Sequence, residues 1–313
     1  MITCEDWRET PASVVGGLFD AECARWDGEL GWDCRAASRL LELARQNGHL
    51  PGLVARDGRG RVVGWTYFLL HDRTLQIGNL VAGNAAAAAA LLDGSLGARE
   101  SRPALRARTF VFPDLPTIES ALLDRGFDIE HYTYMQRRLS TAADRPRKAT
   151  GSPPAPYFVD RWSRKLVPEV VRLLARAYEG MRQARCFAPD GRLEQWTTYV
   201  GQLVETPACG QFEHRVSSVI RASGELVGAV LATALGERTA HIAQMAVAPD
   251  HRGRGVGRHL VHLACERAGS GGFDRLTLLV AQSNDGARRL YERTGFEAVG
   301  EFLFADKDLV AGR

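Results

Sequence analysis

The sequence has few lysines and little net charge, and these shortages bear on its possible partners. Lysine occurs only at positions 148, 165 and 307, and the 40 basic residues are nearly balanced by 37 acidic ones. The formal net charge is therefore only +3. Because nucleic-acid binding requires a clear excess of positive charge, we expect no nucleic-acid partner.

Cysteine pairs and long apolar runs are also missing. The six cysteines are scattered and no two form a Cys-x-x-Cys pair, which argues against a zinc site or a disulfide framework and for a reducing compartment. The first residues carry Glu5 and Asp6 instead of a basic and then apolar leader, and no stretch of eighteen apolar residues occurs. We expect a cytoplasmic protein without a membrane partner.

What is present is typical of a globular protein. The chain has 313 residues, of which 45% are hydrophobic and 25% charged. A chain of this length can bury a large core, and its length favours two domains.

The most informative stretch runs from Gln244 to Arg258. An apolar strand over Ile242 to Val247 is followed by a Pro-Asp turn and a loop in which glycine alternates with arginine or valine. The following helix is expected over Val256–Arg267, because Val256, Leu260 and Ala264 recur at helical spacing. The pattern therefore predicts a strand, a glycine-rich loop and a helix in succession.

A glycine-rich loop that enters a helix predicts a binding site for phosphate or pyrophosphate. The first backbone N–H groups of the helix lack acceptors, the helix dipole adds positive charge, and glycines allow a ligand to approach closely. A P-loop is excluded because no Gly-Lys-Ser/Thr follows, and Gly253, Gly255 and Gly257 are too evenly spaced for a dinucleotide fingerprint. A glycine-rich turn before an ordinary helix is the simpler alternative.

The stretch resembles the acyl-CoA signature of the GNAT (GCN5-related N-acetyltransferase) superfamily. That signature reads Arg/Gln-x-x-Gly-x-Gly/Ala after a Val-x-Pro strand end, and here Val247-Ala248-Pro249 is followed by Arg252-Gly253-Arg254-Gly255-Val256-Gly257. Asn284, Tyr291 and Gly295-Phe296 stand downstream at the spacing of that family's asparagine, helix tyrosine and closing Gly-Phe. The resemblance implies acetyl-CoA, or another acyl-CoA, as co-substrate.

The resemblance also implies roles for individual residues. Tyr291 is expected to be the catalytic general acid that protonates the departing thiolate, with a packed helix tyrosine as the alternative. Asn284 is expected to contact the cofactor and also to be the N-cap of its helix. The remaining cofactor-binding residues form the strand end and the loop: Met245, Ala246, Val247, Arg252, Gly253, Arg254, Gly255, Val256, Gly257 and Arg258. No metal site is expected.

The order of features occurs twice in the chain, with a period of about 165 residues. A hairpin at Leu53–Arg56 and Val62–Leu69, then a strand at Thr74–Val81, matches the order found from Val219 to Ile242. The duplication predicts two tandem domains, and the resemblance implies an α/β (α+β) fold in which each is GNAT-like, with a mixed, mostly antiparallel sheet flanked by helices. We place them at residues 1–140 and 157–313, with a linker rich in Pro, Ser, Thr and Ala at 141–156.

The first copy lacks the residues that carry the signature. Gly83-Asn84 and six alanines stand where the second copy has its glycine and arginine loop, and the positions of Asn284 and Tyr291 hold Leu115 and Leu122. The first copy therefore resembles a degenerate GNAT domain that has lost its acyl-CoA site.

The acceptor half of the reaction stays open. Helices expected at Val167–Tyr178 and Leu193–Val204 cover the acceptor site in the family, and the residues that could touch substrate are Tyr178, Met181, Arg185 and Trp196, although core packing is favoured for Trp196. The family often has a glutamate near the end of the central strand, where this chain has Gln244. His241 alternates to the other face if the strand is regular. The base is therefore not assigned.

The expected activity is transfer of an acetyl group from acetyl-CoA to the primary amine of a small molecule, directly and through a tetrahedral intermediate. A peptide or protein N-terminal acetyltransferase and a non-catalytic acyl-CoA-binding module are the alternatives. We expect a monomer or a homodimer.

Overall fold

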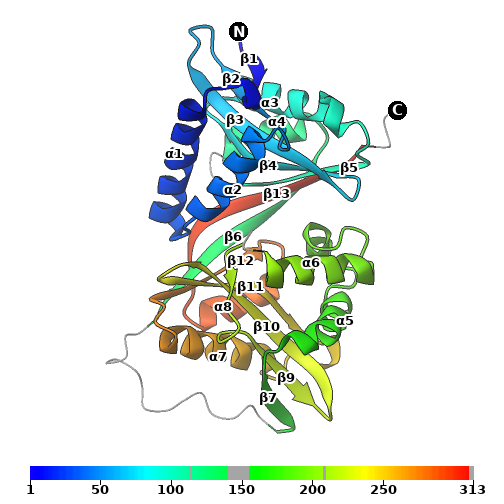
Figure 1. Cartoon of the computed structure of the whole chain (residues 1–313). Helices are drawn as coiled ribbons and strands as arrows, with labels where there is room; N and C mark the ends of the chain where they lie inside the picture. Colours follow the sequence, from blue (N-terminus) through cyan, green and yellow to red (C-terminus); the bar gives the residue numbers. More distant parts are fainter. Residues whose placement is uncertain (113–114, 140–154, 207–208, 310–313) are drawn as a thin grey trace. The chain divides into compact units, whose positions relative to one another are not determined.

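The computed structural model describes residues 1–112, 115–139, 155–206 and 209–309 (Figure 1). Most of the predicted linker, residues 141–154, therefore lies outside the described residues. The chain divides into two compact units. Unit 1 contains Met1–Arg25, Arg35–Tyr132 and Glu301–Arg313, and unit 2 contains Trp26–Cys34 and Thr133–Gly300.

Strands β6 (Asp128–Arg138) and β13 (Glu297–Asp308) each contribute residues to both units. Each compact unit thus contains residues from both halves of the sequence. The domain boundaries near residues 140 and 157 describe sequence repeats, and they stay a prediction.

The sheet of unit 1 is antiparallel except for one pair of strands. Its order is β1, β2, β3, β4, β5 and the C-terminal part of β13, and only β4 and β5 run parallel. The first five strands are β1 (Thr3–Asp6), β2 (Gly52–Arg56), β3 (Val62–His71), β4 (Thr74–Ala82) and β5 (Arg106–Val111). The predicted hairpin and third strand are confirmed, and β1 is a strand that the sequence pattern did not indicate.

Helices cover both faces of this sheet. Neighbouring residues of a strand point to opposite faces, so Val54 and Ala55 identify the helices on each side. Val54 packs with residues of α1 (Ala12–Leu30) and α2 (Arg35–Gln46), and Ala55 packs with residues of α3 (Ala85–Gly97) and α4 (Leu115–Leu123). Leu122, which stands at the position of Tyr291 in the other repeat, is completely buried in this second core.

Unit 2 repeats this plan. Its sheet order is β6, β12, β11, β10, β9 and β7, with β8 paired to β10, and β11 and β12 form a parallel pair. The strands are β7 (Tyr157–Arg161), β8 (Gln211–Phe212), β9 (Ser218–Ala222), β10 (Glu225–Gly236), β11 (Thr239–Val247) and β12 (Arg275–Ala281). The fold class predicted from the sequence is therefore confirmed.

Two helix pairs also enclose the sheet of unit 2. Gln244 of β11 contacts Tyr178 at the end of α5 (Val167–Ala177) and Tyr199 on α6 (Leu193–Glu205). Val247, three residues later and so on the other face, lies beside α7 (Val256–Ser270), which packs on α8 (Asp285–Arg293). Short 3₁₀ turns complete the chain: η1 (Trp7–Glu9), η2 (Arg99–Ser101), η3 (Arg164–Leu166), η4 (Arg182–Cys186) and η5 (Pro249–His251).

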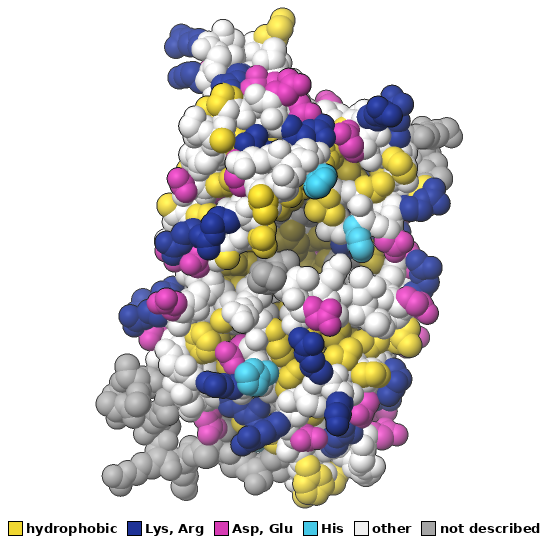
Figure 2. Space-filling view, viewed as in Figure 1, with side chains coloured by type: hydrophobic (Ala, Val, Ile, Leu, Met, Phe, Trp, Pro, Cys, Tyr) yellow, Lys and Arg dark blue, Asp and Glu magenta, His cyan; other side chains and the backbone are white. Residues whose placement is uncertain are grey.

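The chain after Gly295-Phe296 forms the single long strand β13. The visible surface mixes charges of both signs, with basic and acidic side chains interspersed (Figure 2). Among the described residues, no helix is long and apolar enough to cross a bilayer.

Candidate functional site

Strand β11 leaves its parallel neighbour halfway along its length. The pairing with β12 covers Thr239–Ile242 against Arg275–Leu278, whereas the pairing with β10 continues to Val247. Among the described strands, none pairs with the far side of residues 243–247. Alternate residues of a strand direct their N–H and C=O groups to the same side, and the Ala248 N–H bonds to the Val227 carbonyl next to β10. Ala246 therefore faces β10, and the backbone groups on the unpaired side are those of Met245 and Val247.

A β-bulge at Ala243 accompanies this divergence. Leu231 pairs with Gln244, whereas the next residue of β10, Ala232, pairs with Ile242, so Ala243 is the extra residue. The bulge changes the regular alternation on which the expected orientation of His241 depended. Such bulges commonly redirect a side chain next to a functional site.

Gln244 is held between two tyrosines. Its Oε1 accepts a hydrogen bond of 2.8 Å from the Tyr178 hydroxyl, and its Nε2 donates one of 3.4 Å to the Tyr199 hydroxyl. Burial raises the pKa of both phenols far above the ordinary value. The position at which the family often has a glutamate is therefore surrounded by neutral groups.

Sequence reasoning missed Tyr199 and Phe187. Phe187 contacts Tyr199 with ring centroids 4.8 Å apart, and Tyr178 contacts Trp196 at 5.3 Å. The spacing of three between Trp196 and Tyr199 on α6 was the available signal for one aromatic face. Trp196 is only 1% exposed, so the favoured packing role is confirmed.

The loop before α7 has the backbone that its glycines predict. Gly253 and Gly255 have φ angles of 72° and 85°, in the left-handed region where other residues are strained. A Cβ atom at either position would meet nothing within 4 Å, so both glycines face open space.

The start of α7 lacks a side-chain cap. Gly255 is the N-cap residue, and the first hydrogen bond of the helix runs from the His259 N–H to the Gly255 carbonyl at 3.0 Å. The N–H groups of Val256, Gly257 and Arg258 precede it and have no acceptor within the helix. Arg254 and Arg258 are exposed and form no ion pair with any described residue. The arrangement suits a phosphate or pyrophosphate.

Two residues of the signature have structural partners instead. The Arg252 guanidinium donates to the Ala177 carbonyl at 2.6 Å and to the Val247 carbonyl at 3.3 Å, so it ties the loop to the end of α5. A Cβ atom on Gly257 would lie 3.3 Å from Leu290 Cδ2, so Gly257 allows α7 to pack against α8. Ligand contacts by these two residues stay a prediction.

Tyr291 and Asn284 both lie on α8. Tyr291 is 6% exposed and packs against Phe296, and its hydroxyl has no hydrogen-bond partner among the described residues. Burial raises its pKa well above the ordinary value, so it is protonated at neutral pH. Asn284 is the N-cap of α8 and accepts a hydrogen bond from the Ala287 N–H at 3.2 Å, as expected.

His241 belongs to a different environment from Gln244. Its Nδ1 lies 2.9 Å from the Thr277 hydroxyl, and its ring stacks on Tyr134 with centroids 6.1 Å apart. Burial lowers the pKa of His241 to about 3, so the ring is neutral. Among the described residues, no three His, Cys, Asp or Glu side chains gather as a metal site requires.

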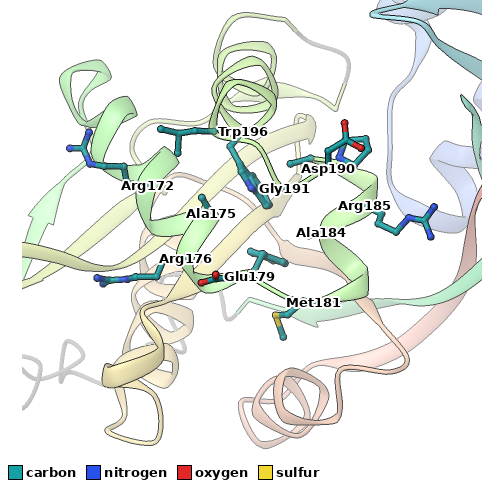
Figure 3. A pocket seen from close by; sticks show the side chains of 15 residues that line it. Arg172, Ala175, Arg176, Glu179, Met181, Ala184, Arg185, Asp190, Gly191 and Trp196 are labelled. Atoms are coloured by element: carbon teal, nitrogen blue, oxygen red, sulfur yellow. The ribbon is translucent and has the colours of Figure 1, made fainter. Parts of the chain in front are cut away.

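A cavity of about 630 Å³ opens between α5, η4 and α6 (Figure 3). All four residues that the sequence suggested for substrate contact line it, namely Tyr178, Met181, Arg185 and Trp196. The lining contains no residue of β11 or of the glycine loop. Tyr178 links the cavity to β11 because it belongs to the lining and its hydroxyl contacts Gln244.

Comparisons with known proteins agree with this geometry. Residues 168–296 match the acetyltransferase (GNAT) family. A curated relative, GCN5-related N-acetyltransferase 6 (chloroplastic) of Arabidopsis thaliana, is 24% identical over 160 residues, which is 48% of this chain. The match spans only 55% of that relative's length.

Two solved structures share the fold along nearly the whole chain. A GCN5-related N-acetyltransferase from Sphaerobacter thermophilus gives a TM-score of 0.68 at 15% identity and covers 98% of this chain and 95% of its own. A tandem GNAT protein from the clavulanic acid biosynthesis pathway gives 0.62 at 19% identity and covers 98% of both chains. The sequence match assigns residues 168–296 to the GNAT acetyltransferase family, and the two structural likenesses show the fold of the chain.

Proposed function

We propose that the chain is an acetyl-CoA-dependent N-acyltransferase that acts on the primary amine of a small molecule. One observation carries the proposal: the strand β11, which has an unpaired edge, is followed by the glycine loop and then by a helix start that no side chain caps. The unpaired strand edge suits the extended arm that carries the thioester, and the uncapped helix start suits the pyrophosphate of the same cofactor.

The donor half of the proposed site divides into two parts. Of the predicted strand residues Met245, Ala246 and Val247, the first and the third have backbone groups on the unpaired side. These groups would bind the extended pantetheine arm and the thioester carbonyl. The N–H groups at the start of α7 would bind the pyrophosphate, with Arg254 and Arg258 adding charge-assisted hydrogen bonds. Together they would hold the thioester in one orientation.

Tyr291 is the proposed general acid. In the reaction the amine nitrogen attacks the carbonyl carbon, the C–S bond breaks, and the departing thiolate takes a proton. Burial keeps Tyr291 protonated over the whole neutral range, so the proton is present, while the same rise in pKa makes the phenol a weaker acid. The acid role is proposed from the position of Tyr291 in the signature. The surplus proton of the amine leaves to water, because Gln244 offers no base.

The other repeat is proposed to be degenerate. Asn84 caps α3 with its own side chain, and no arginine stands in the two-residue loop before that helix. We therefore expect one acyl-CoA for each chain.

Release of CoA from acetyl-CoA in the presence of a panel of small amines and peptides tests the proposal. We expect turnover on at least one small amine, and a loss of about 100-fold in kcat for Tyr291→Phe with unchanged acetyl-CoA affinity. An unchanged kcat would remove Tyr291 as the acid. Tight acetyl-CoA binding without turnover on any amine would favour a binding module, and turnover on peptides alone would favour a peptide acetyltransferase.

A further inference from the structure

We propose that the acceptor is a small amine that also carries an anionic group, a carboxylate or a phosphate, and that it binds in the cavity between α5 and α6. The inference rests on the proposed acyltransferase function and names the substrate class of that site. Two observations support the inference: the charged residues that line the cavity, and the hydrogen bonds that connect the cavity to the donor site.

The cavity has more cations than available anions. Arg172 and Arg176 project from one face of α5 and Arg185 from η4 on the opposite side, and in this view all three guanidinium groups lie at the rim of the cavity, turned outward from the other lining residues (Figure 3). Arg172 and Arg176 are exposed and form no ion pair with any described residue. Two guanidinium groups one helical turn apart are suited to a carboxylate or a phosphate.

The two carboxylates in the lining differ. Asp190 accepts hydrogen bonds from Gln195 Nε2 at 2.9 Å and from Arg192 at 3.2 Å, so its charge is already compensated. Glu179 has no ion-pair partner among the described residues, and it follows Tyr178 directly. The cavity therefore presents one uncompensated carboxylate on the side where α5 ends, and a zwitterion has the matching charge of opposite sign.

The remainder of the lining is apolar, with Ala175, Met181, Ala184, Leu193 and Trp196 among its residues. A volume of about 630 Å³ is typical of sites for small molecules. Both properties favour a compact acceptor over a folded protein.

Two hydrogen bonds place the cavity next to the proposed donor site. The Tyr178 hydroxyl donates to Gln244 on β11, and Arg252 of the glycine loop donates to the Ala177 carbonyl at the end of α5. The segment that lines the cavity, Tyr178 to Met181, begins at this junction. An acceptor that extends from the arginines toward Tyr178 would have its amine end nearest to the thioester.

The neutral surroundings of Gln244 bear on the protonation state of the amine. Attack requires the unprotonated amine, and no carboxylate occupies the Gln244 position to remove a proton. The acceptor must therefore bind as the free amine or lose its proton to water.

Matched acceptors test the inference. Acetylation rates would be measured for an α-amino acid, its carboxamide, the corresponding amine without the carboxylate, and an aminoalkyl phosphate. We expect kcat/KM to be at least tenfold higher for the anionic acceptors, and the last compound distinguishes phosphate from carboxylate. Equal rates on the neutral amines would overturn the inference while leaving the proposed function intact.

The variant Arg172→Gln/Arg176→Gln tests the location. We expect about a tenfold rise in KM for the anionic acceptor, with unchanged kcat, acetyl-CoA affinity and rates on neutral amines. Arg215→Gln is the control, since Arg215 is exposed and lies outside the lining. A double variant that behaves like this control would overturn the inference.

Calorimetric titration of the amino acid and the aminoalkyl phosphate into the CoA-bound protein adds a measurement that does not depend on turnover. Binding that the double variant weakens would support the cavity as an anionic-amine site even if no acceptor were acetylated. Equal binding to both proteins, or none, would overturn it. Failure of acetyl-CoA itself to bind would contradict the proposed function separately.

Discussion

The two repeats begin their central helices in different ways, and the difference indicates how a helix start becomes a ligand site. In unit 1, two residues separate β4 from α3, and the Asn84 side chain accepts a hydrogen bond of 2.9 Å from the Ala87 N–H. In unit 2, eight residues separate β11 from α7, and the N-cap residue Gly255 has no side chain. A self-capped helix has fewer N–H groups to offer an anion, whereas an uncapped one leaves them for the ligand.

The strands that lead to these helices are, by contrast, closely alike. In each unit the parallel pairing covers four residues, Thr74–Ile77 on β4 and Thr239–Ile242 on β11. A register shift follows in both antiparallel partners. The Tyr67 ring lies over Gly78, the residue that corresponds to Ala243 of the bulge. In unit 1, therefore, β4 also diverges from β5, and the Tyr67 ring covers the point of divergence.

The largest effect is expected from removing the features that unit 2 has alone. The variant Arg254→Ala/Gly255→Ala deletes one guanidinium and forces alanine into the left-handed region, at a cost of roughly 1–2 kcal/mol. We expect acetyl-CoA affinity, measured by titration calorimetry, to fall by about 100-fold or more. Full-strength residual binding at one site per chain would mean that unit 1 still binds the cofactor.

A matched control comes from unit 1. Gly83→Ala changes the glycine in the corresponding loop, where a Cβ atom would make an ordinary 3.4 Å contact with the Val63 carbonyl. We expect no change in acetyl-CoA affinity for this variant.

Much of this contrast could be read from the sequence. The strand, the loop and both helices around Gly253–Gly257 follow from hydrophobic spacing and glycine placement, because local geometry there depends on neighbouring residues. The Asn84 and Asn284 caps follow for the same reason. The fold class and the helix pair over the acceptor cavity were also predictable.

Interactions between distant segments were not predictable. Tyr178 and Tyr199 meet Gln244 from helices that are 66 and 45 residues away in sequence. The bulge at Ala243 and the bond from Arg252 to Ala177 depend on packing that no local pattern encodes. The division of β13 between the two units, after Gly300, likewise depends on the whole fold.

A second prediction concerns the buried histidine of unit 2, whose counterpart in unit 1 is Gln76. Burial lowers the pKa of His241 from 6.5 to about 3, so the unfolded chain takes up a proton more readily than the folded protein. Stability is therefore lost as pH falls below 6.5 and until about 3, by roughly 1.4 kcal/mol per pH unit.

The variant His241→Gln should remove this contribution. We expect its free energy of unfolding, measured in urea between pH 6.5 and 4.5, to depend on pH less steeply by about 1 kcal/mol per unit. The slope is the readout because the variant also loses the contact with Tyr134. His214→Gln, at an exposed position, is the control, and equal slopes for the two variants would contradict the prediction.

A smaller effect is expected where Tyr67 covers unit 1. In Gly78→Ala the added Cβ atom would overlap the Tyr67 ring, which stacks on Trp7 with centroids 5.9 Å apart. Displacing this ring should lower the free energy of unfolding by about 1–2 kcal/mol. Acetyl-CoA affinity should stay at the wild-type value, since the change lies in unit 1. A change in that affinity would contradict the assignment of the cofactor to unit 2.

The smallest effect returns to the capped helix of unit 1. Asn84→Ala removes the acceptor of the Ala87 N–H and leaves the start of α3 uncapped, as the start of α7 is. We expect a loss of about 1 kcal/mol in unfolding free energy, because the orphaned N–H must then be satisfied by water. No acetyl-CoA site should arise, because the two-residue loop supplies neither an arginine nor a glycine in the left-handed region. Binding of a second equivalent of acetyl-CoA in calorimetry would contradict this expectation. It would show that the Asn84 cap alone prevents binding in unit 1, and that an uncapped helix start binds the cofactor without arginines.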